Sequence, residues 1–318
     1  MEVTLSIYVI IVTYNGAPWI RGALESLRNS DITSVPLVID NASSDDTRAI
    51  VEREFPEARL VPLTENVGFG RGNNVGISLA LREGAGAVFL LNQDAYVTPS
   101  ALRELSAFLA LHVEYAVVSP LHCSPDTSSL DHQTLRGYLQ PYASRYLSDA
   151  CLGTVRDHYE IRGINAAAWM VRADAFKIVG GFDPLYFMYG EDDDLIARFH
   201  YLGLSFALLP KSRIVHLRAR SPRMKKGLGV EVWSASERAR SHLLGDLKSP
   251  RGTFVGRMIR LFSEGIAHPF ARFLVDHDWK ELCAHVLATG RVLVDQPRIA
   301  RSTRLCATRG PHFLDLAD

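Results

Sequence analysis

Long apolar runs are missing from this sequence, and its longest apolar stretches, such as residues 7–12, have only the length of a strand. A helix that crosses a bilayer needs about 20 apolar residues, so no transmembrane segment is expected. Residues 1–4 also lack the basic region and the small-residue cleavage site of a secretion signal. We therefore predict an intracellular, cytoplasmic protein.

Cysteine is scarce, and no C-x-x-C pair occurs. This absence argues against zinc ribbons and thioredoxin-like redox motifs. In an intracellular chain we expect reduced, partly buried thiols. The four residues concerned are Cys123, Cys151, Cys283 and Cys306.

The chain has no excess of either charge, because 35 Lys and Arg balance 35 Asp and Glu. Since no nucleic-acid reader motif is present either, nucleic-acid binding is not expected. The charges are nevertheless segregated, with a balance of −10 over residues 1–210 and +10 over residues 211–318. The basic part could approach a membrane surface or a diphosphate-bearing acceptor, or its arginines could face solvent and the acidic half.

Short apolar runs alternate with helical patterns in the first half, which predicts an α/β fold with a mainly parallel central sheet and flanking helices. Strands are expected at residues 5–12, 35–39, 59–63, 87–91, 115–119, 166–171, 204–208 and 212–215. Helices are expected at residues 18–27, 71–81, 98–111, 173–179 and 195–202. A further helix is expected to follow the cap residues 43–46 and to end at residue 51. Residues 122–160 show no periodicity and are expected to be irregular and functional, and helices dominate from about residue 230.

Polar residues follow the first two predicted strands where each strand ends. In open α/β sheets, ligands bind beyond the carboxyl ends of the strands. Asp40 could accept a hydrogen bond from a nucleobase there, with Thr13 and Asn15 framing the same pocket. Asp40 could equally cap the following helix, and its position does not decide between the two roles.

Residues 65–76 form a glycine-rich loop that leads into a predicted helix. Its four glycines would let a ligand approach the backbone, the helix N-terminus would face phosphate, and Arg71 could add charge. The spacing matches neither the P-loop nor the dinucleotide-binding fingerprint. The loop indicates phosphate binding only because it belongs to the same sheet edge.

Two residues at strand ends could bind a divalent cation. Asp94 follows the strand at residues 87–91, and His216 ends the last predicted strand. Hard oxygen ligands near a diphosphate suit Mg²⁺ or Mn²⁺, and an imidazole could be a second ligand. The alternatives are that Asp94 forms a turn and that His216 is a buried structural histidine.

Four consecutive acids, residues 191–194, open a helix after Tyr189 and Gly190. Acidic residues favour a helix N-terminus through the helix dipole, which accounts for part of the run. Crowding four of them raises the proton affinity of at least one, which suits a general base near neutral pH. Charge alone does not say which of the four is the base.

Taken in order, these segments resemble the family-2 glycosyltransferases, which have the GT-A nucleotide-diphospho-sugar transferase fold, and above all their rhamnosyltransferase-like branch. The similarity covers residues 5 to about 220 and implies a catalytic domain at 1–220, with a nucleotide-sugar half at about 1–120 and an acceptor half at about 121–220. Residues 221–318 would form a helical C-terminal extension. The matching segments are VIIVTYN at 9–15, VIDNAS at 38–43, NVGFG at 66–70 with Asn73 and Gly76, LLNQD at 90–94, GGFD at 180–183 and YGED at 189–192.

The resemblance implies a nucleotide-sugar donor, a divalent metal (Mg²⁺ or Mn²⁺), and roles for the matching residues. Asp192 would be the catalytic base and Glu191 would orient the acceptor, while Asp94 and His216 would bind the metal. Asn92 stands where the family's DxD motif has its first acid, which puts a direct metal-ligand role for it in doubt. The donor would contact Thr13, Tyr14, Asn15, Asp40, Asn66, Gly68, Gly70, Arg71, Asn73 and Asn92, and the acceptor would contact Asn165 and Trp169.

The implied reaction moves a sugar, with rhamnose as the candidate, from dTDP or UDP to a hydroxyl of a glycan or a lipid-linked acceptor, with inversion, in polysaccharide or cell-wall biosynthesis. A nucleotidyltransferase is the alternative enzyme, but its basic glycine-rich first loop is absent. An inactive sugar-nucleotide or glycan-binding module is the alternative outside enzymes. The combination of Asp94, Asp192 and His216 argues against that module.

Residues 251–266 predict a basic amphipathic helix, with Phe254, Met258, Leu261 and Phe262 on one face. Apolar helix faces most often pack in a core, so we expect this face to pack onto the catalytic domain or onto a second subunit as a homodimer. Contact with an anionic membrane is the alternative, and it would place the protein peripherally at the inner face of that membrane.

Overall fold

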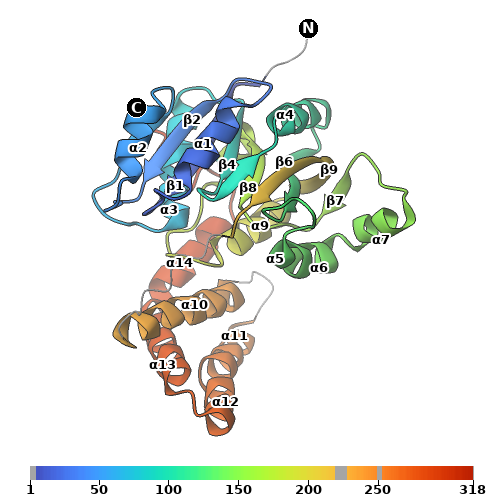
Figure 1. Ribbon diagram of the computed structural model, residues 1–318. Coiled ribbons are helices and arrows are strands. Elements are labelled where there is room, and N and C mark those ends of the chain that lie inside the picture. The colour runs from blue at the N-terminus through green and yellow to red at the C-terminus, as the bar shows by residue number, and fades with distance from the viewer. Residues whose placement is uncertain (1–4, 219–227, 249–252, 318) are drawn as a thin grey trace.

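The computed structural model of the protein describes residues 5–218, 228–248 and 253–317. A sheet with helices on both faces forms the larger part, and a group of helices extends from it (Figure 1). The strands are β1 (Ile7–Thr13), β2 (Val35–Asp40), β3 (Arg59–Pro62), β4 (Ala87–Leu91), β5 (Ala95–Val97), β6 (Tyr115–Cys123), β7 (Tyr159–Ile161), β8 (Ala168–Arg172) and β9 (Ser205–His216).

The helices fall into the same two groups. Those of the larger part are α1 (Ile20–Arg28), α2 (Thr47–Glu54), α3 (Phe69–Arg82), α4 (Ala101–Leu111), α5 (His132–Thr134), η1 (Leu135–Leu139), α6 (Gln140–Tyr142), α7 (Ser144–Leu152), α8 (Ala173–Val179) and α9 (Glu191–Tyr201). The helical region comprises α10 (Leu228–Lys248), α11 (Phe254–Phe262), η2 (Ser263–Ala267), α12 (His268–Asp276), α13 (Trp279–Val294) and α14 (Gln296–Cys306).

The strand order of the sheet is β3-β2-β1-β4-β8-β6-β9-β5, and β7 also pairs with β9. The first four strands in this order are parallel, as predicted. The sheet as a whole is mixed, because β8 lies antiparallel between β4 and β6, and because β5 and β7 are antiparallel to β9. The predicted α/β class with flanking helices is confirmed.

Side chains alternate across β1, so the strand supplies both faces of the sheet. Val9 and Ile11 join the core under α1, α2 and α4, whereas Ile10 and Val12 join the core under α3, α8 and α9. A strand buried on both faces is uniformly apolar, which explains the first apolar run of the sequence. The result is a sheet enclosed between two helical layers (Figure 1).

Glycines bring α3 unusually close to β1. A Cβ added to Gly72 would lie 2.8 Å from Val12, and one added to Gly76 would lie 2.6 Å from Ile10. Neither position has room for a side chain unless the strand residue moves. Part of the glycine-rich pattern around residues 65–76 is therefore a packing requirement.

Two sequence-based predictions of local structure were wrong. Residues 122–160 are not irregular, because they contain α5, η1, α6, α7 and β7. The longest of these helices has nine residues, which is too short to leave a clear periodicity in the sequence. The strands predicted at 204–208 and 212–215 form one strand, β9, whose pairing with β6 shifts register next to Pro210, a residue without an N–H to donate.

The helical region has a small core of its own, which Tyr186 joins from the larger part. Leu261 is buried and Met258 packs in this core, whereas Phe262 is exposed; the side chain of Phe254 lies outside what the structure describes. Beside the buried face, α11, η2 and α12 carry an apolar stripe of exposed residues: Val255, Ile259, Phe262, Ile266, Phe270 and Leu274. In the described part of the chain, every helix is too short or too polar to cross a membrane.

A tail segment, residues 310–317, leaves the helical region and returns to the larger part (Figure 1). The backbone N–H of Gly310 donates to the carbonyl of Ile178, and the N–H of Gly181 donates to the carbonyl of His312, each at 2.8 Å. Leu314 packs against the core of the larger part, which we call the sheet domain. The helical region is therefore attached to the larger part at both of its ends.

Candidate functional site

The carboxyl ends of β1 and β2 meet at one sheet edge, where Thr13 lies opposite Asp40 in the parallel register. Asp40 is fully buried. Its Oδ2 accepts hydrogen bonds from the N–H of Ser43, at 3.1 Å, and from Arg48. Its Oδ1 has no hydrogen-bond partner among the described residues. Because a buried carboxylate oxygen normally has a donor, Asp40 Oδ1 is an unsatisfied acceptor at this sheet edge.

Gln93 connects the end of β1 to the segment that follows β4. Its Oε1 accepts hydrogen bonds from Thr13 Oγ1, at 2.6 Å, and from the N–H of Tyr14, at 3.1 Å. Asn15 adopts a left-handed backbone conformation (φ 48°), and its Oδ1 accepts a hydrogen bond from the N–H of Ser44. Of the three residues that end β1 and follow it, Thr13 is buried, Tyr14 is exposed and Asn15 is partly exposed.

The loop before α3 is shaped by close contacts with the segment before α9. The N–H of Gly68 donates to Asn66 Oδ1 at 3.0 Å. Gly68 has φ 89°, and a side chain there would collide with the carbonyl oxygen of Phe187. A Cβ on Gly70 would lie 2.9 Å from Phe182 Cβ. These glycines bring the loop next to the start of α9, and their predicted contact with a donor stays a prediction.

Arg71 and Asn73, both predicted donor contacts, bind backbone carbonyls. Arg71 donates to the carbonyl of Pro184 at 3.1 Å and is exposed. Asn73 is buried and donates to the carbonyl of Phe69 one turn earlier in α3. Arg71 can exchange its carbonyl for a phosphate oxygen, whereas Asn73 offers little surface to a ligand.

The two predicted metal ligands come together from distant parts of the sequence. Asp94 immediately precedes β5, and His216 pairs with Ala95 of that strand. His216 Nε2 lies 3.6 Å from Asp94 Oδ1, and the imidazole is buried. Two donor atoms on one Mg²⁺ at about 2.1 Å lie about 3 Å apart, so the pair fits a shared cation. Asn92 adds a buried Oδ1 without a hydrogen-bond partner in the described chain.

A loop at residues 163–167 connects this pair to the acidic run. The N–H of Asn92 donates to the carbonyl of Ala167 at 3.0 Å. The N–H of the preceding residue, Ala166, donates to Asp192 Oδ2 at 3.4 Å. Asn165, a predicted acceptor residue, has a buried Oδ1 with no partner among the described residues. Neighbouring residues of one loop thus bond to Asn92, beside the predicted metal ligands, and to Asp192 of the acidic run.

Trp169, the other predicted acceptor residue, lies in the core. It is fully buried in β8, its Nε1 donates to the carbonyl of Ile164 at 3.1 Å, and its ring meets Phe206 edge to face. The alternation of β8 turns this side chain into the core under α3 and α9. The structure therefore gives Trp169 a packing role, without a surface that an acceptor could touch.

His122 was not anticipated from the sequence. It is buried on β6, its ring lies 6.1 Å from that of His216, and its Nδ1 is 3.3 Å from Thr134 Oγ1. Burial, together with the neighbouring His216, lowers the pKa of His122 to about 3. It is therefore a neutral imidazole behind the metal pair. His122 is the first of residues 122–160, a range whose sequence has no periodicity that would have singled it out, and the structure places it in β6.

The acidic run opens α9, as predicted. Burial raises the pKa of Asp192 to about 6, with the adjacent charge of Asp193 as the second cause. Burial likewise raises the pKa of Glu191 to about 8, with the charge of Asp192 as the second cause. Asp192 is therefore able to accept a proton near neutral pH, whereas Glu191 holds one.

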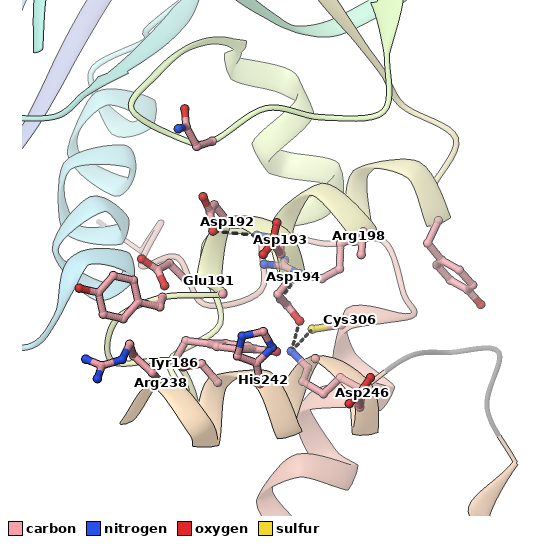
Figure 2. A pocket seen from close by; sticks show the side chains of 18 of the residues that line it. Tyr186, Glu191, Asp192, Asp193, Asp194, Arg198, Arg238, His242, Asp246 and Cys306 are labelled. Atoms are coloured by element: carbon pink, nitrogen blue, oxygen red, sulfur yellow. Dashed lines mark hydrogen bonds and ion pairs between the residues drawn. The ribbon is translucent and has the colours of Figure 1, made fainter. Parts of the chain in front are cut away.

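A cleft of about 760 Å³ opens between α9 and the helical region (Figure 2). Glu191, Asp192 and Asp193 line it from α9, and Asn165 joins them, as expected of an acceptor residue. Arg238 and His242 of α10 face this acidic wall. The sequence did not reveal the α10 wall, because the pattern of a single helix does not say which neighbour its polar face will meet.

A buried ion cluster joins α9 to the helical region. Lys248, at the end of α10, pairs with Asp183 and Asp194, and all three side chains are almost fully buried. Ser302 of α14 donates to Asp183, and Cys306 Sγ lies 3.8 Å from Lys248 Nζ. Asp183, Asp194 and Cys306 are close enough together to hold a metal ion. Lys248 and Arg198 together already balance the charges of the two carboxylates, so we interpret the cluster as structural.

Asp194 consequently differs from its neighbours in the acidic run. Burial alone would raise the pKa of Asp194, but Lys248 and Arg198 lower it below its usual value. Arg198 Nε contacts Asp194 Oδ2 at 3.0 Å. Asp194 is therefore an ionised structural residue, in contrast to Glu191 and Asp192, whose pKa values are raised.

Comparison with known proteins adds family information to this geometry. The model described as glycosyl transferase family 2 matches residues 8–178, which is more than half of the chain. A second model, described as the N-terminal domain of galactosyltransferase, matches residues 152–220. The two matches together span the sheet, the acidic run and the predicted metal ligands.

The chain is similar to N-acetylglucosaminyl-diphospho-decaprenol L-rhamnosyltransferase of Mycobacterium tuberculosis, with 28% identity over 235 residues that cover 67% of this chain and 76% of the relative. Rhamnosyltransferase WbbL of Escherichia coli K12 is 25% identical over 66% of this chain and 83% of its own. The solved structure of S. aureus TarS residues 1–349 in complex with UDP-GlcNAc has a TM-score of 0.57 at 17% identity, covering 95% and 88% of the two chains. This last likeness, which concerns the fold alone, confirms the predicted GT-A architecture.

Proposed function

The chain belongs to glycosyl transferase family 2, and we propose that it is an inverting enzyme that moves a sugar from a nucleoside diphosphate to a hydroxyl group. The observation that carries this proposal is that one loop, residues 163–167, bonds both to Asp192 and to Asn92, which lies two residues before Asp94 of the Asp94–His216 pair. A cation-binding pair and a proton acceptor are the two parts that this displacement needs.

The donor is proposed to bind across the carboxyl ends of β1 and β2. The unpartnered Oδ1 of Asp40 accepts the N–H of a pyrimidine base, which both UDP and dTDP carry. Tyr14 and Asn15 border the sugar and the diphosphate, and Arg71 adds positive charge. The relatives' names contain rhamnosyltransferase, so rhamnose is the proposed sugar.

Asp94 and His216 are proposed to hold a divalent cation, and Asn92 stands beside them. When bound there, the cation supplies positive charge to the leaving diphosphate, where negative charge develops in the transition state. Asp192 takes the proton of the acceptor hydroxyl while the oxygen of that hydroxyl forms a bond to the anomeric carbon of the donor sugar. The bond to the diphosphate breaks on the opposite face, so the configuration inverts. Glu191 is protonated at neutral pH and orients the acceptor by donating a hydrogen bond.

The acceptor is proposed to occupy the cleft between α9 and α10, with Asn165 as a polar contact. A glycan or a lipid-linked sugar provides the hydroxyl that the reaction requires. The M. tuberculosis relative is named for a diphospho-decaprenol substrate, which supports a lipid-linked acceptor for this chain. Trp169 is left out of the proposed acceptor contacts because it is buried.

Calorimetric titration with UDP and with dTDP, each with and without Mn²⁺, tests the donor site. We expect one nucleotide to bind, about tenfold or more tightly with Mn²⁺, because the pair Asp94–His216 brings the cation to the diphosphate. The Asp94→Ala protein should still bind nucleotide weakly but lose the effect of the metal. The matched control is Asp246→Asn, which lies on α10 away from the donor side. Metal-independent binding by the parent protein would contradict the metal assignment.

The apolar stripe of α11–α12 is proposed to contact a lipid surface, since arginines such as Arg260 and Arg272 lie beside it and residues 211–318 are basic overall. Flotation with liposomes should recover the protein with anionic vesicles and much less with zwitterionic ones. Ile259→Asp and Phe262→Asp should abolish flotation. If the protein instead elutes as a dimer that these two substitutions dissociate, the stripe is a subunit interface. Cytoplasmic localisation stays a prediction.

A further inference from the structure

Helix α10 places two basic side chains in the cleft, and neither of them pairs with another described side chain to stabilise the fold. Arg238 and His242 are one turn apart, both are exposed, and both line the cleft (Figure 2). Within the described residues, neither forms an ion pair or a side-chain hydrogen bond. The cleft's other cationic residues, Arg198, Arg218 and Lys248, are all paired with carboxylates.

The unpaired state of Arg238 is notable because the opposite wall is acidic. Glu191, Asp192 and Asp193 line the cleft from α9, and Asp246 lies on α10 itself. An arginine in such a setting could close onto a carboxylate, yet Arg238 remains open to the cleft. A guanidinium presents several N–H donors in a fixed fork that matches two phosphate oxygens, and an imidazole N–H can add a third contact.

We propose that Arg238 and His242 bind a phosphate group of the acceptor. The inference rests on the proposed function and deepens it, because it defines the acceptor class as a phosphate- or diphosphate-bearing molecule. Its hydroxyl would lie at the α9 wall beside Asp192, and its phosphate at the α10 wall. The catalytic base belongs to the larger part and the anion site to the helical region, so the two parts share one substrate.

The size of the cleft agrees with this arrangement. A volume of about 760 Å³ is within the range of pockets that hold small organic ligands. The acidic wall also discourages binding of the phosphate at α9, since like charges repel there. A phosphate-bearing acceptor is therefore oriented by charge, with its anionic end at α10 and its neutral sugar end at the base.

The test is calorimetric titration of the full-length protein, in EDTA, with geranyl diphosphate, inorganic pyrophosphate and geraniol. We expect geranyl diphosphate to bind and geraniol to bind far more weakly. Binding of inorganic pyrophosphate with equal affinity would indicate recognition of phosphate alone, whereas tighter binding of geranyl diphosphate would indicate a lipid diphosphate. Arg238→Gln should weaken binding of the diphosphate probe by about tenfold or more, and Arg238→Lys by less.

Two controls make the outcomes distinct. Arg301→Gln removes an exposed arginine from α14, outside the cleft and outside the apolar stripe, and should leave diphosphate binding unchanged. Nucleotide binding with Mn²⁺ should be the same in Arg238→Gln and in the parent protein. The inference is overturned if neither phosphate probe binds, or if Arg238→Gln binds as well as the parent protein. If nucleotide binding with Mn²⁺ is absent as well, the proposed function fails with it; if it is present, only the acceptor inference fails.

Discussion

The turnover number of the Asp192→Asn protein is expected to be about 10²–10⁴-fold lower than that of the parent protein, whereas nucleotide binding should be equally tight. The side chain lies in the cleft and its Oδ2 accepts the N–H of Ala166. An asparagine can occupy the same position, but it cannot take the proton of the acceptor hydroxyl. Initial rates of sugar transfer, with calorimetric titration of the nucleotide in parallel, separate these two properties. Normal turnover would exclude Asp192 as the base.

The turnover number is also expected to depend on pH through Asp192. Because burial raises the pKa of Asp192 to about 6 and a base acts when ionised, turnover should be low below pH 6 and should rise to a plateau above it. Asp193→Asn removes the neighbouring charge that also raises this pKa, so the rise should move to lower pH. Rates measured from pH 5 to pH 8 provide the check. A rise that stays in place in Asp193→Asn would show that another group titrates.

The second large effect is expected on stability. Replacing Lys248 by Met should lower the free energy of unfolding by about 3–5 kcal/mol, because it leaves two buried carboxylates without their shared cation. Asp194 keeps Arg198 as a partner, so Asp183 bears most of the loss. Thermal and urea unfolding followed by circular dichroism measure the change. A Lys248→Met protein as stable as the parent would contradict the assigned role.

Two further variants identify the cause of that loss. Adding Asp183→Asn to Lys248→Met removes the stranded charge and should restore part of the stability. Lys280→Met breaks an exposed pair with Glu231 and should leave the free energy of unfolding close to that of the parent protein. If the double variant is no more stable than Lys248→Met, lost packing rather than unpaired charge is the cause.

The sheet edge could be predicted because its signals are local. Asp94 and His216 each follow an apolar strand, and β4 and β9 end at the same edge, since β8 is antiparallel to both β4 and β6 and β9 runs with β6. The crowded acidic run could be recognised in the same way, although Asp192 was singled out within it only by the family resemblance. The fold class followed from alternating apolar runs and helical patterns. These features need only a few neighbouring residues to be visible.

The remaining parts depend on contacts that no local pattern contains. The motif that includes Asp183 marks a loop near the site, but its partners Lys248 and Ser302 come from α10 and α14. Trp169 falls beside the acceptor loop in sequence, yet the alternation of β8 turns it into the core. Gly70 belongs to a glycine-rich loop of the kind that binds phosphate. In the structure, however, a glycine is required there because Phe182 leaves no room for a side chain.

The return of the tail segment to the sheet domain determines how the helical region can be exchanged between proteins. Gly310 and His312 bond to backbone beside α8, and Leu314 enters the core of the sheet domain. A chimera made by replacing everything after residue 220 would also remove these contacts. A graft bounded at about residues 228 and 308 keeps them with their own domain. The helical region is therefore best exchanged as an internal cassette rather than as a terminal fusion.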